Sequence, residues 1–138
     1  MTAAKLEFKS FPTVLISDDN PYVIRALERL IRAEGGRIIA DLNSKVVELA
    51  RTHQPVLIIL DIAQKTDGRH LLRKLKRDVL TKGIDAFVLT ASADPVVREL
   101  CLRLGASDYF VKPADARFFL KLGKYLALRQ RKRNRTKQ

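Results

Sequence analysis

The sequence predicts an α/β fold, a doubly wound sheet of five parallel strands that alternate with helices. Short apolar runs, typical of strands buried on both faces, recur five times along the chain. Segments with apolar residues at helical spacing follow each run. Parallel neighbouring strands need such helical crossovers, which place helices on both faces of the sheet.

The third predicted strand is the clearest of the five. Residues 56–60 are five consecutive apolar side chains, with Pro55 at the entrance and Asp61 directly after them. A run this short and continuous is typical of a central strand in a parallel sheet. The other predicted strands are residues 13–17, 37–41, 84–90 and 108–111.

Capping residues, prolines and glycines mark the ends of the predicted helices. Asn20 before Pro21 and Asp94 before Pro95 are typical signals for a helix N-terminus. Gly105 ends the helix that follows Asp94. The predicted helices begin near residues 21, 44, 68, 95 and 114 or 115, and the second covers about residues 44–52.

Length and composition indicate one globular domain in a reducing compartment. The chain has 138 residues, 46% hydrophobic and 30% charged, and contains no apolar run long enough to span a membrane. Its N-terminus lacks the apolar region of a secretion signal, so we expect a cytoplasmic protein. Cys101 is the single cysteine, and its apolar helical neighbours predict a core residue.

About half of the net charge of +12 comes from the C-terminal end of the chain. We therefore predict a leader at residues 1–11, a folded domain at residues 12–128 and a basic tail at residues 129–138. A basic tail can attract nucleic acid or an acidic partner. The alternative is an unstructured end or the start of a linker.

Charged and hydroxyl side chains follow four of the five strands, at one expected edge of the sheet. Asp18 and Asp19 follow the first strand, Asp61 the third, Thr90 ends the fourth, and Lys112 follows the fifth. Carboxylates that meet at one edge repel each other, and Mg²⁺, which prefers oxygen ligands, would relieve the repulsion. A lysine and a hydroxyl beside the metal suit a phosphoryl group, which a carboxylate can accept as an acyl phosphate.

Short motifs in chain order carry a resemblance to a known family. They are the sequences LISDD at residues 15–19, ILD at 59–61, LTA at 89–91 and GASDYFVKP at 105–113. Together they resemble the response-regulator receiver domain, the phosphoacceptor module of two-component signalling, over about residues 12–128. The resemblance implies a flavodoxin-like (βα)5 fold with strand order 2-1-3-4-5.

The resemblance also implies an acceptor and a metal site. Asp61 would accept a phosphoryl group from a phosphohistidine on a sensor histidine kinase or a histidine phosphotransfer protein. Asp19, Asp61 and the backbone carbonyl of Ala63 would bind Mg²⁺, and Asp18 would assist directly or through water. Such a domain is a signalling phosphoacceptor whose only chemistry is its own phosphorylation and dephosphorylation.

Phosphate-binding and switch residues follow from the same resemblance. Lys112, the Thr90 hydroxyl and the N–H of Ala91 would bind the phosphoryl oxygens, and the Lys112–Pro113 peptide is expected to be cis. Tyr109 occupies the place of the aromatic switch residue, although simple packing is an equal alternative. Phosphorylation would reshape the face of the fourth helix, fifth strand and fifth helix, through which a homodimer could also form.

The loop after Asp61 departs from the family pattern. Residues 62–68 lack the usual proline and reach the Asp-Gly pair one residue early, and Lys65 adds a positive charge. This departure keeps open a receiver-like docking module that works without phosphorylation, with nucleic-acid contact through the basic tail as an addition. A haloacid-dehalogenase type of hydrolase would need an Asp-x-Asp motif after its first strand, which this chain lacks.

Overall fold

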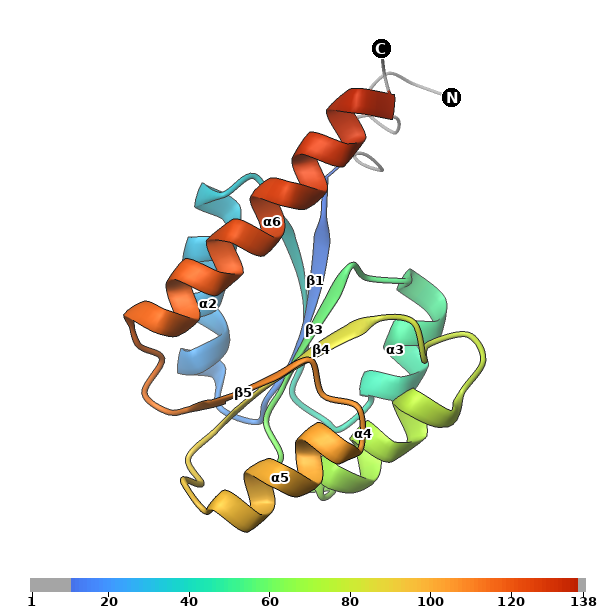
Figure 1. Ribbon diagram of the computed structural model, residues 1–138, viewed down its shortest axis with the longest axis vertical. Helices are drawn as coiled ribbons and strands as arrows, with labels where there is room; N and C mark the ends of the chain where they lie inside the picture. Colours follow the sequence, from blue (N-terminus) through green and yellow to red (C-terminus); the bar gives the residue numbers. More distant parts are fainter. Residues whose placement is uncertain (1–10, 137–138) are drawn as a thin grey trace.

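The computed structural model describes residues 11–136, and its centre is a sheet of five parallel strands (Figure 1). Their order across the sheet is β2-β1-β3-β4-β5, with every neighbouring pair parallel. The predicted fold and strand order are therefore confirmed. The strands are β1 (Thr13–Ser17), β2 (Arg37–Asp41), β3 (Leu57–Leu60), β4 (Asp85–Thr90) and β5 (Asp108–Val111).

Within the described residues, five helices cover the two faces of the sheet (Figure 1). On one face lie α2 (Pro21–Ala33) and α6 (Ala116–Thr136). On the other lie α3 (Val46–His53), α4 (Gly68–Arg77) and α5 (Pro95–Arg103). The sheet is therefore the middle layer of three.

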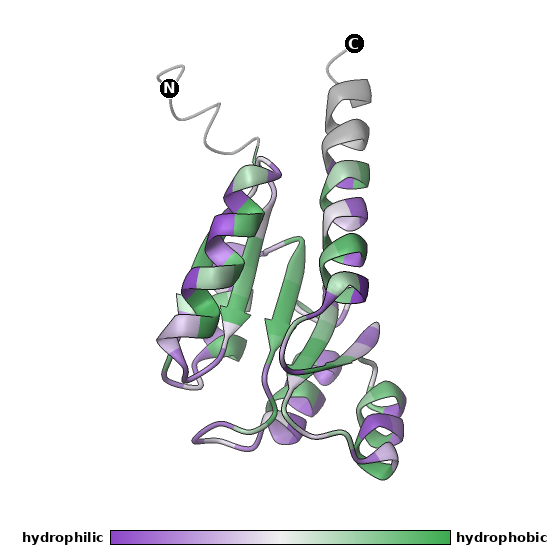
Figure 2. Ribbon diagram, turned by 90° about the vertical axis from the view of Figure 1, so that its left-hand side faces the viewer, coloured by the Kyte–Doolittle hydropathy of each residue, from purple (hydrophilic) through white to green (hydrophobic). Residues whose placement is uncertain are grey.

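Two hydrophobic clusters, one on each face of the sheet, form the core. Successive residues of a strand point to opposite faces. Ile58 and Leu60 accordingly join the cluster beneath α3, α4 and α5, whereas Leu57 and Ile59 join the cluster beneath α2 and α6. Figure 2 shows the resulting band of hydrophobic strands between the helices. Asp61 thus follows a strand that is anchored in both clusters.

Side-chain caps fix the starts of several helices, as the sequence predicts for Asn20 and Asp94. Asn20, Asp67 and Asp94 each accept a hydrogen bond of 2.9 Å from the N–H two residues further on. Asp115 caps α6 through the N–H three residues further on, at 3.1 Å. This last helix therefore begins one or two residues after the predicted start.

The predicted start of the second helix at residue 44 is wrong. Ser44 has a φ of 56°, in the left-handed region, so it cannot lie in the first turn of a right-handed helix. Helix α3 begins at Val46 instead. Val46 and Val47 face the core, and Leu49 is only partly buried.

Cys101 is a free and fully buried thiol in the cluster beneath α5, so the predicted core role is confirmed. Burial raises the pKa of this thiol, because a thiolate would lose its hydration there. The residue therefore packs as a small hydrophobic side chain.

Both chain ends lie partly outside the described residues. The predicted leader falls there except for residue 11, as do residues 137 and 138 of the predicted basic tail. Helix α6 includes Arg129, whose guanidinium lies 3.3 Å from the carboxylate of Asp85. No helix in residues 11–136 is long and apolar enough to cross a membrane.

Candidate functional site

Asp61 lies at the carboxyl end of β3, the middle strand of the sheet, and is 4% exposed. Its backbone N–H donates to the carbonyl of Ser17 at 2.9 Å, which holds it against the end of β1. Its Oδ1 accepts a hydrogen bond from the N–H of Ala63 at 2.9 Å. Its Oδ2 accepts one from the Nζ of Lys112 at 2.8 Å. The carboxylate therefore has a fixed orientation at the sheet edge.

Asp18 and Asp19 bring two further carboxylates to Asp61. One oxygen atom from each of the three side chains lies within 4.8 Å of the others. Asp18 is buried and Asp19 is exposed, so the cluster has one side open to solvent. Three clustered carboxylates are a suitable oxygen set for a divalent cation such as Mg²⁺. The predicted convergence of these residues is confirmed, and the donors present fit the predicted ion.

The ammonium group of Lys112 lies between two of these carboxylates. Its Nζ is 2.8 Å from Oδ2 of Asp18 and 2.8 Å from Oδ2 of Asp61. Burial alone would lower the pKa of Lys112, but the hydrogen bonds to the two carboxylates outweigh burial and raise it. Lys112 is therefore charged at neutral pH and offsets one of the three negative charges. The Lys112–Pro113 peptide is cis, as expected.

The position of Asp18 affects both folding and ligand binding. Burial raises the pKa of its carboxyl group, against the opposing effect of hydrogen bonds from Lys112 and from the N–H of Asn20. A carboxyl group whose pKa is raised by folding contributes stability at pH values below its unfolded-state pKa. This contribution is lost as the pH rises through the folded-state pKa. At neutral pH the ionised carboxylate of Asp18 thus opposes folding, and a bound cation would offset that opposition.

Thr90 carries a buried hydroxyl group at the end of β4 that has no hydrogen-bond partner within the described part of the chain. With Ala63 and Ser92 it lines a hollow of about 410 Å³ beside the loop that follows Asp61. An unpaired buried hydroxyl costs roughly 1–3 kcal/mol. An oxygen-bearing ligand in this hollow would gain that hydrogen bond. Ala91 follows at the same edge and is exposed.

Tyr109 points into the core beneath α5 and is 2% exposed. Its hydroxyl donates to the backbone carbonyl of Ser92 at 2.7 Å, and burial raises the pKa of the phenol. The ring is thereby connected to the segment that begins at Thr90. This position agrees with the packing interpretation, and the switch role stays a prediction.

The shortened loop after Asp61 closes tightly on itself. The N–H of Gly68 donates to the carbonyl of Ile62 at 2.9 Å. A Cβ atom at position 68 would lie 2.3 Å from the Cα of Ile62, so only glycine fits there. Lys65, predicted to place a charge near the site, is exposed and lines the same hollow as Thr90.

The sequence analysis missed Gln64, the third residue of this loop. Its Nε2 donates to the backbone carbonyl of Asp61 at 2.6 Å. No motif marks this residue. The available signal is that Ser17 and Asp41 are polar residues at the ends of neighbouring strands, and buried polar groups need partners.

Comparison with known proteins finds relatives that align with most of the chain. The family model of the response regulator receiver domain matches residues 14–122. The transcriptional regulatory protein AruR of Pseudomonas aeruginosa is 31% identical over 127 residues, which cover 87% of this chain and 51% of AruR. The phosphate regulon transcriptional regulatory protein PhoB of the same species is 32% identical, and the match covers 76% of this chain and 47% of PhoB. This chain spans about half the length of these curated relatives.

Solved structures share the fold described above. A CheY-like receiver domain protein from Methanospirillum hungatei aligns with a TM-score of 0.76 and 22% identity, covering 88% of this chain and 98% of that one. The receiver domain of the sensor histidine kinase PA1611 from Pseudomonas aeruginosa aligns with a TM-score of 0.74 and 23% identity, covering 85% and 98%. That structure holds a magnesium ion in its active-site cleft.

Proposed function

The chain belongs to the response regulator receiver family of two-component systems, and we propose that it accepts a phosphoryl group on Asp61 during phosphorelay signalling. One observation carries the proposal. The same sheet edge gathers the carboxylate of Asp61, two further carboxylates, the ammonium of Lys112 and the hydroxyl of Thr90, which has no partner among residues 11–136. Nucleophile, cation-binding oxygens and phosphate-binding groups are the components that acyl-phosphate formation needs.

The transfer is a displacement at phosphorus. A carboxylate oxygen of Asp61 attacks the phosphorus atom of a phosphohistidine, a P–O bond forms, and the P–N bond breaks. The imidazole leaves with the electron pair and takes up a proton. Attack by water on the same phosphorus later releases inorganic phosphate and restores the carboxylate. The chemistry is thus confined to phosphorylation and dephosphorylation of the domain itself.

Three groups would bind the transferred phosphoryl oxygens. The ammonium of Lys112, already 2.8 Å from Asp61, would move from the carboxylate to a phosphoryl oxygen. The Thr90 hydroxyl would gain a partner, which the described residues do not supply. The N–H of Ala91, next along the chain, would donate to another oxygen.

Mg²⁺ would be held by oxygen atoms of Asp18, Asp19 and Asp61, with the backbone carbonyl of Ala63. When bound, the ion supplies positive charge that offsets the carboxylates and the incoming phosphoryl oxygens. The protein contributes the fixed positions of these ligands, since Asp18 and Asp61 are already oriented by Lys112.

The phosphohistidine donor needs a docking surface beside the acceptor. An apolar hollow of about 560 Å³ lies between the starts of α2 and α6 and includes Lys112 in its lining. Tyr22 and Phe119 line it and are 76% and 38% exposed. Exposed aromatic side chains around an apolar hollow suit a helical partner. We assign this surface to a sensor histidine kinase or a histidine phosphotransfer protein in the cytoplasm.

The signal would leave through the face formed by α5, β5 and α6. The hydroxyl of Tyr109 in β5 donates a hydrogen bond to the segment after Thr90. Asp108 forms ion pairs with Arg117 and Lys121 of α6. A shift of Thr90 toward a phosphoryl group would change the place of Tyr109 and so the packing of this face. A second copy of the chain or another partner would bind there differently in the two states.

Incubation with Mg²⁺ and acetyl phosphate, followed by intact-mass analysis, tests the proposal. The chain is expected to gain one phosphoryl group that is stable in acid and lost in base. A metal chelator added beforehand should prevent the gain. A mass that stays unchanged at saturating Mg²⁺ would reject the proposal and favour a receiver-like docking module that works without phosphorylation.

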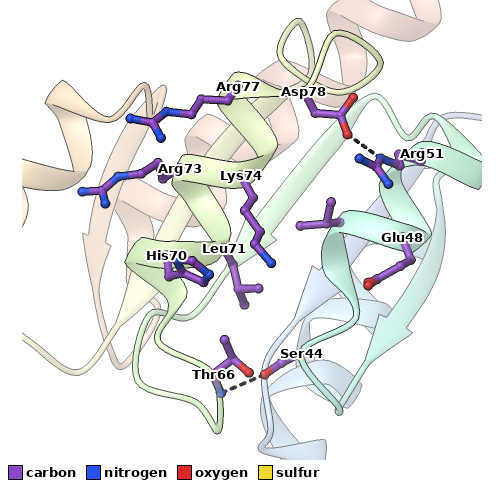
Figure 3. Close-up of a pocket in the computed structure, with 11 residues that line it drawn as sticks. Ser44, Glu48, Arg51, Thr66, His70, Leu71, Arg73, Lys74, Arg77 and Asp78 are labelled. Atoms are coloured by element: carbon purple, nitrogen blue, oxygen red, sulfur yellow. Dashed lines mark hydrogen bonds and ion pairs between the residues drawn. The ribbon is translucent and has the colours of Figure 1, made fainter.

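A second candidate function, contact with the phosphate backbone of nucleic acid, is favoured by the charge of α4. This helix contains five lysines and arginines and no acid. Arg73, Lys74 and Arg77 have no anionic partner among the described residues. All three line a groove of about 820 Å³ between α3 and α4, and Figure 3 shows them along α4. Like charges three and four residues apart repel, so a bound polyanion would stabilise the helix.

A salt titration with a short random-sequence DNA duplex tests this second candidate. Binding should weaken steeply as salt rises, because phosphate contacts release counterions. The double variant Arg73→Gln/Arg77→Gln should bind more weakly, with a salt dependence reduced by about one unit per lost contact. The matched control Arg25→Gln/Arg29→Gln has the same spacing on α2 and should bind as wild type. Equal losses in both variants would contradict the assignment to α4 and leave the basic tail as the binding segment.

A further inference from the structure

The side chain of Gln64 connects the loop after Asp61 to two other segments at this edge of the sheet. Its Nε2 donates to the backbone carbonyl of Asp61 at 2.6 Å and lies 3.1 Å from the hydroxyl of Ser17 at the end of β1. Its Oε1 accepts a hydrogen bond of 3.0 Å from the hydroxyl of Ser44, which precedes α3. One amide group therefore contacts three segments that are far apart in the sequence.

Donors and acceptors match along the whole chain of hydrogen bonds. The hydroxyl of Ser17 donates to the buried carboxylate of Asp41 at 2.8 Å, so it can accept from Gln64. The hydroxyl of Ser44 donates to Gln64 and accepts from the N–H of Thr66 at 3.2 Å. Because each hydroxyl donates once and accepts once, the orientation of the amide is fixed. A side chain without both a donor and an acceptor could not replace it.

The backbone of Ser44 indicates that the network has a structural cost. Its φ of 56° lies in the left-handed region, which disfavours residues with a side chain. Such conformations persist where surrounding contacts determine them, and they concentrate at functional sites. Here the contacts are the bonds of the Ser44 hydroxyl to Gln64 and Thr66.

The network holds the first turn of the loop from two sides. The N–H of Ala63 is bonded to Oδ1 of Asp61, and the amide of Gln64 is bonded to the carbonyl of Asp61. The peptide that joins Ala63 to Gln64 lies between these two anchors. The loop is short and has no proline to restrict its backbone. These two hydrogen bonds restrict the turn instead.

We propose that Gln64 is a positioning residue for phosphoryl transfer, which fixes the Ala63 carbonyl for the cation through its bonds to Asp61, Ser17 and Ser44. The inference rests on the proposed function, because that function assigns the Ala63 carbonyl to Mg²⁺. Gln64 itself touches neither the phosphoryl group nor the ion. Replacing Gln64 lowers the affinity for Mg²⁺, and a sufficient concentration of Mg²⁺ restores the rate of phosphoryl transfer.

The variant Gln64→Met tests the proposal, since methionine has a similar unbranched shape and lacks the amide. Gln54→Met is the matched control. The amide of Gln54 also donates to backbone carbonyls, those of Ala50, Arg51 and Leu80, but it precedes β3, at the opposite edge of the sheet from Asp61. Titration with Mg²⁺ alone, followed by amide NMR spectra, gives the affinity. Rates of labelling by acetyl phosphate over a range of Mg²⁺ give the second readout.

We expect Gln64→Met to weaken Mg²⁺ binding roughly tenfold or more, as is typical for groups that orient metal ligands. Its labelling rate at saturating Mg²⁺ should approach that of wild type, and Gln54→Met should bind Mg²⁺ as wild type does. Ser44→Gly removes one partner of the amide while relieving the backbone, and should give a smaller loss in the same direction.

Several results would overturn the inference. Unchanged Mg²⁺ affinity in Gln64→Met and Ser44→Gly, or equal losses in Gln54→Met, would reject the positioning role while leaving the proposed function intact. A rate that stays low in Gln64→Met at saturating Mg²⁺ would also reject it. A wild-type chain that neither binds Mg²⁺ nor takes up phosphate would reject the proposed function and this inference together.

Discussion

Replacing Asp61 by asparagine is expected to abolish phosphoryl uptake from acetyl phosphate and to leave the fold intact. The amide of asparagine has the shape of the carboxylate but lacks a nucleophilic oxygen, so no acyl phosphate can form. Lys112 keeps its other partner, Asp18, at 2.8 Å. The substitution also removes one of three clustered carboxylates, so repulsion in the metal-free site decreases. We expect stability within about 1 kcal/mol of wild type or slightly above it.

Asp67→Asn provides the matched control for this prediction. It makes the same chemical change at the end of the same loop, where the carboxylate caps α4 at 2.9 Å and is exposed. Asparagine caps helices as well as aspartate does. This variant should be labelled like wild type in intact-mass analysis. Equal labelling of Asp61→Asn and wild type would show that the acceptor is another residue.

Replacing Gly68 by alanine is expected to displace the acceptor loop, with a large loss of both stability and labelling. The new Cβ would lie 2.3 Å from the Cα of Ile62 and 2.6 Å from the carbonyl oxygen of Asp61. Both are backbone atoms, so the clash is relieved only if the loop moves. Overpacking of this kind costs typically about 1–3 kcal/mol, and we expect the upper end. Denaturant unfolding and the labelling rate at fixed Mg²⁺ measure the two effects.

Gly83→Ala separates a specific clash from a general effect of replacing glycine. Gly83 lies in a turn before β4, and apart from its chain neighbours no atom of the described residues lies within 4 Å of an added Cβ. This variant should unfold within about 0.5 kcal/mol of wild type, as surface substitutions usually do, and be labelled at the wild-type rate. A Gly68→Ala protein that unfolds and labels like Gly83→Ala would contradict the close packing of the loop.

The sequence predicts the fold and the gathered carboxylates because both depend on robust patterns. Continuous apolar runs mark the buried strands, and their alternation with helices predicts a doubly wound parallel sheet, whose strand order the family resemblance implies. In parallel strands all carboxyl ends share an edge, so Asp18, Asp61 and Lys112 must approach one another wherever the helices begin. Errors of one or two residues at helix starts leave that edge unchanged.

The sequence does not reveal which side chains form hydrogen bonds between neighbouring loops. Gln64 is one polar residue in a polar loop, and its contacts with Ser17 and Ser44 depend on how two connections fold beside each other. The misplaced start of α3 has the same origin. Ser44 is the predicted first residue of this helix, whereas its hydroxyl accepts a hydrogen bond from the neighbouring loop and its backbone is left-handed.

Two adjacent aromatic side chains of β5 lie in different layers of the molecule. Tyr109 belongs to the cluster beneath α3, α4 and α5, and Phe110 belongs to the cluster beneath α2 and α6. A rotation of the Tyr109 ring would therefore loosen or tighten one layer while the opposite layer keeps its contacts around Phe110. Communication from the sheet edge would then reach the α5 side of the output face, while the hollow between α2 and α6 that receives the donor keeps its packing.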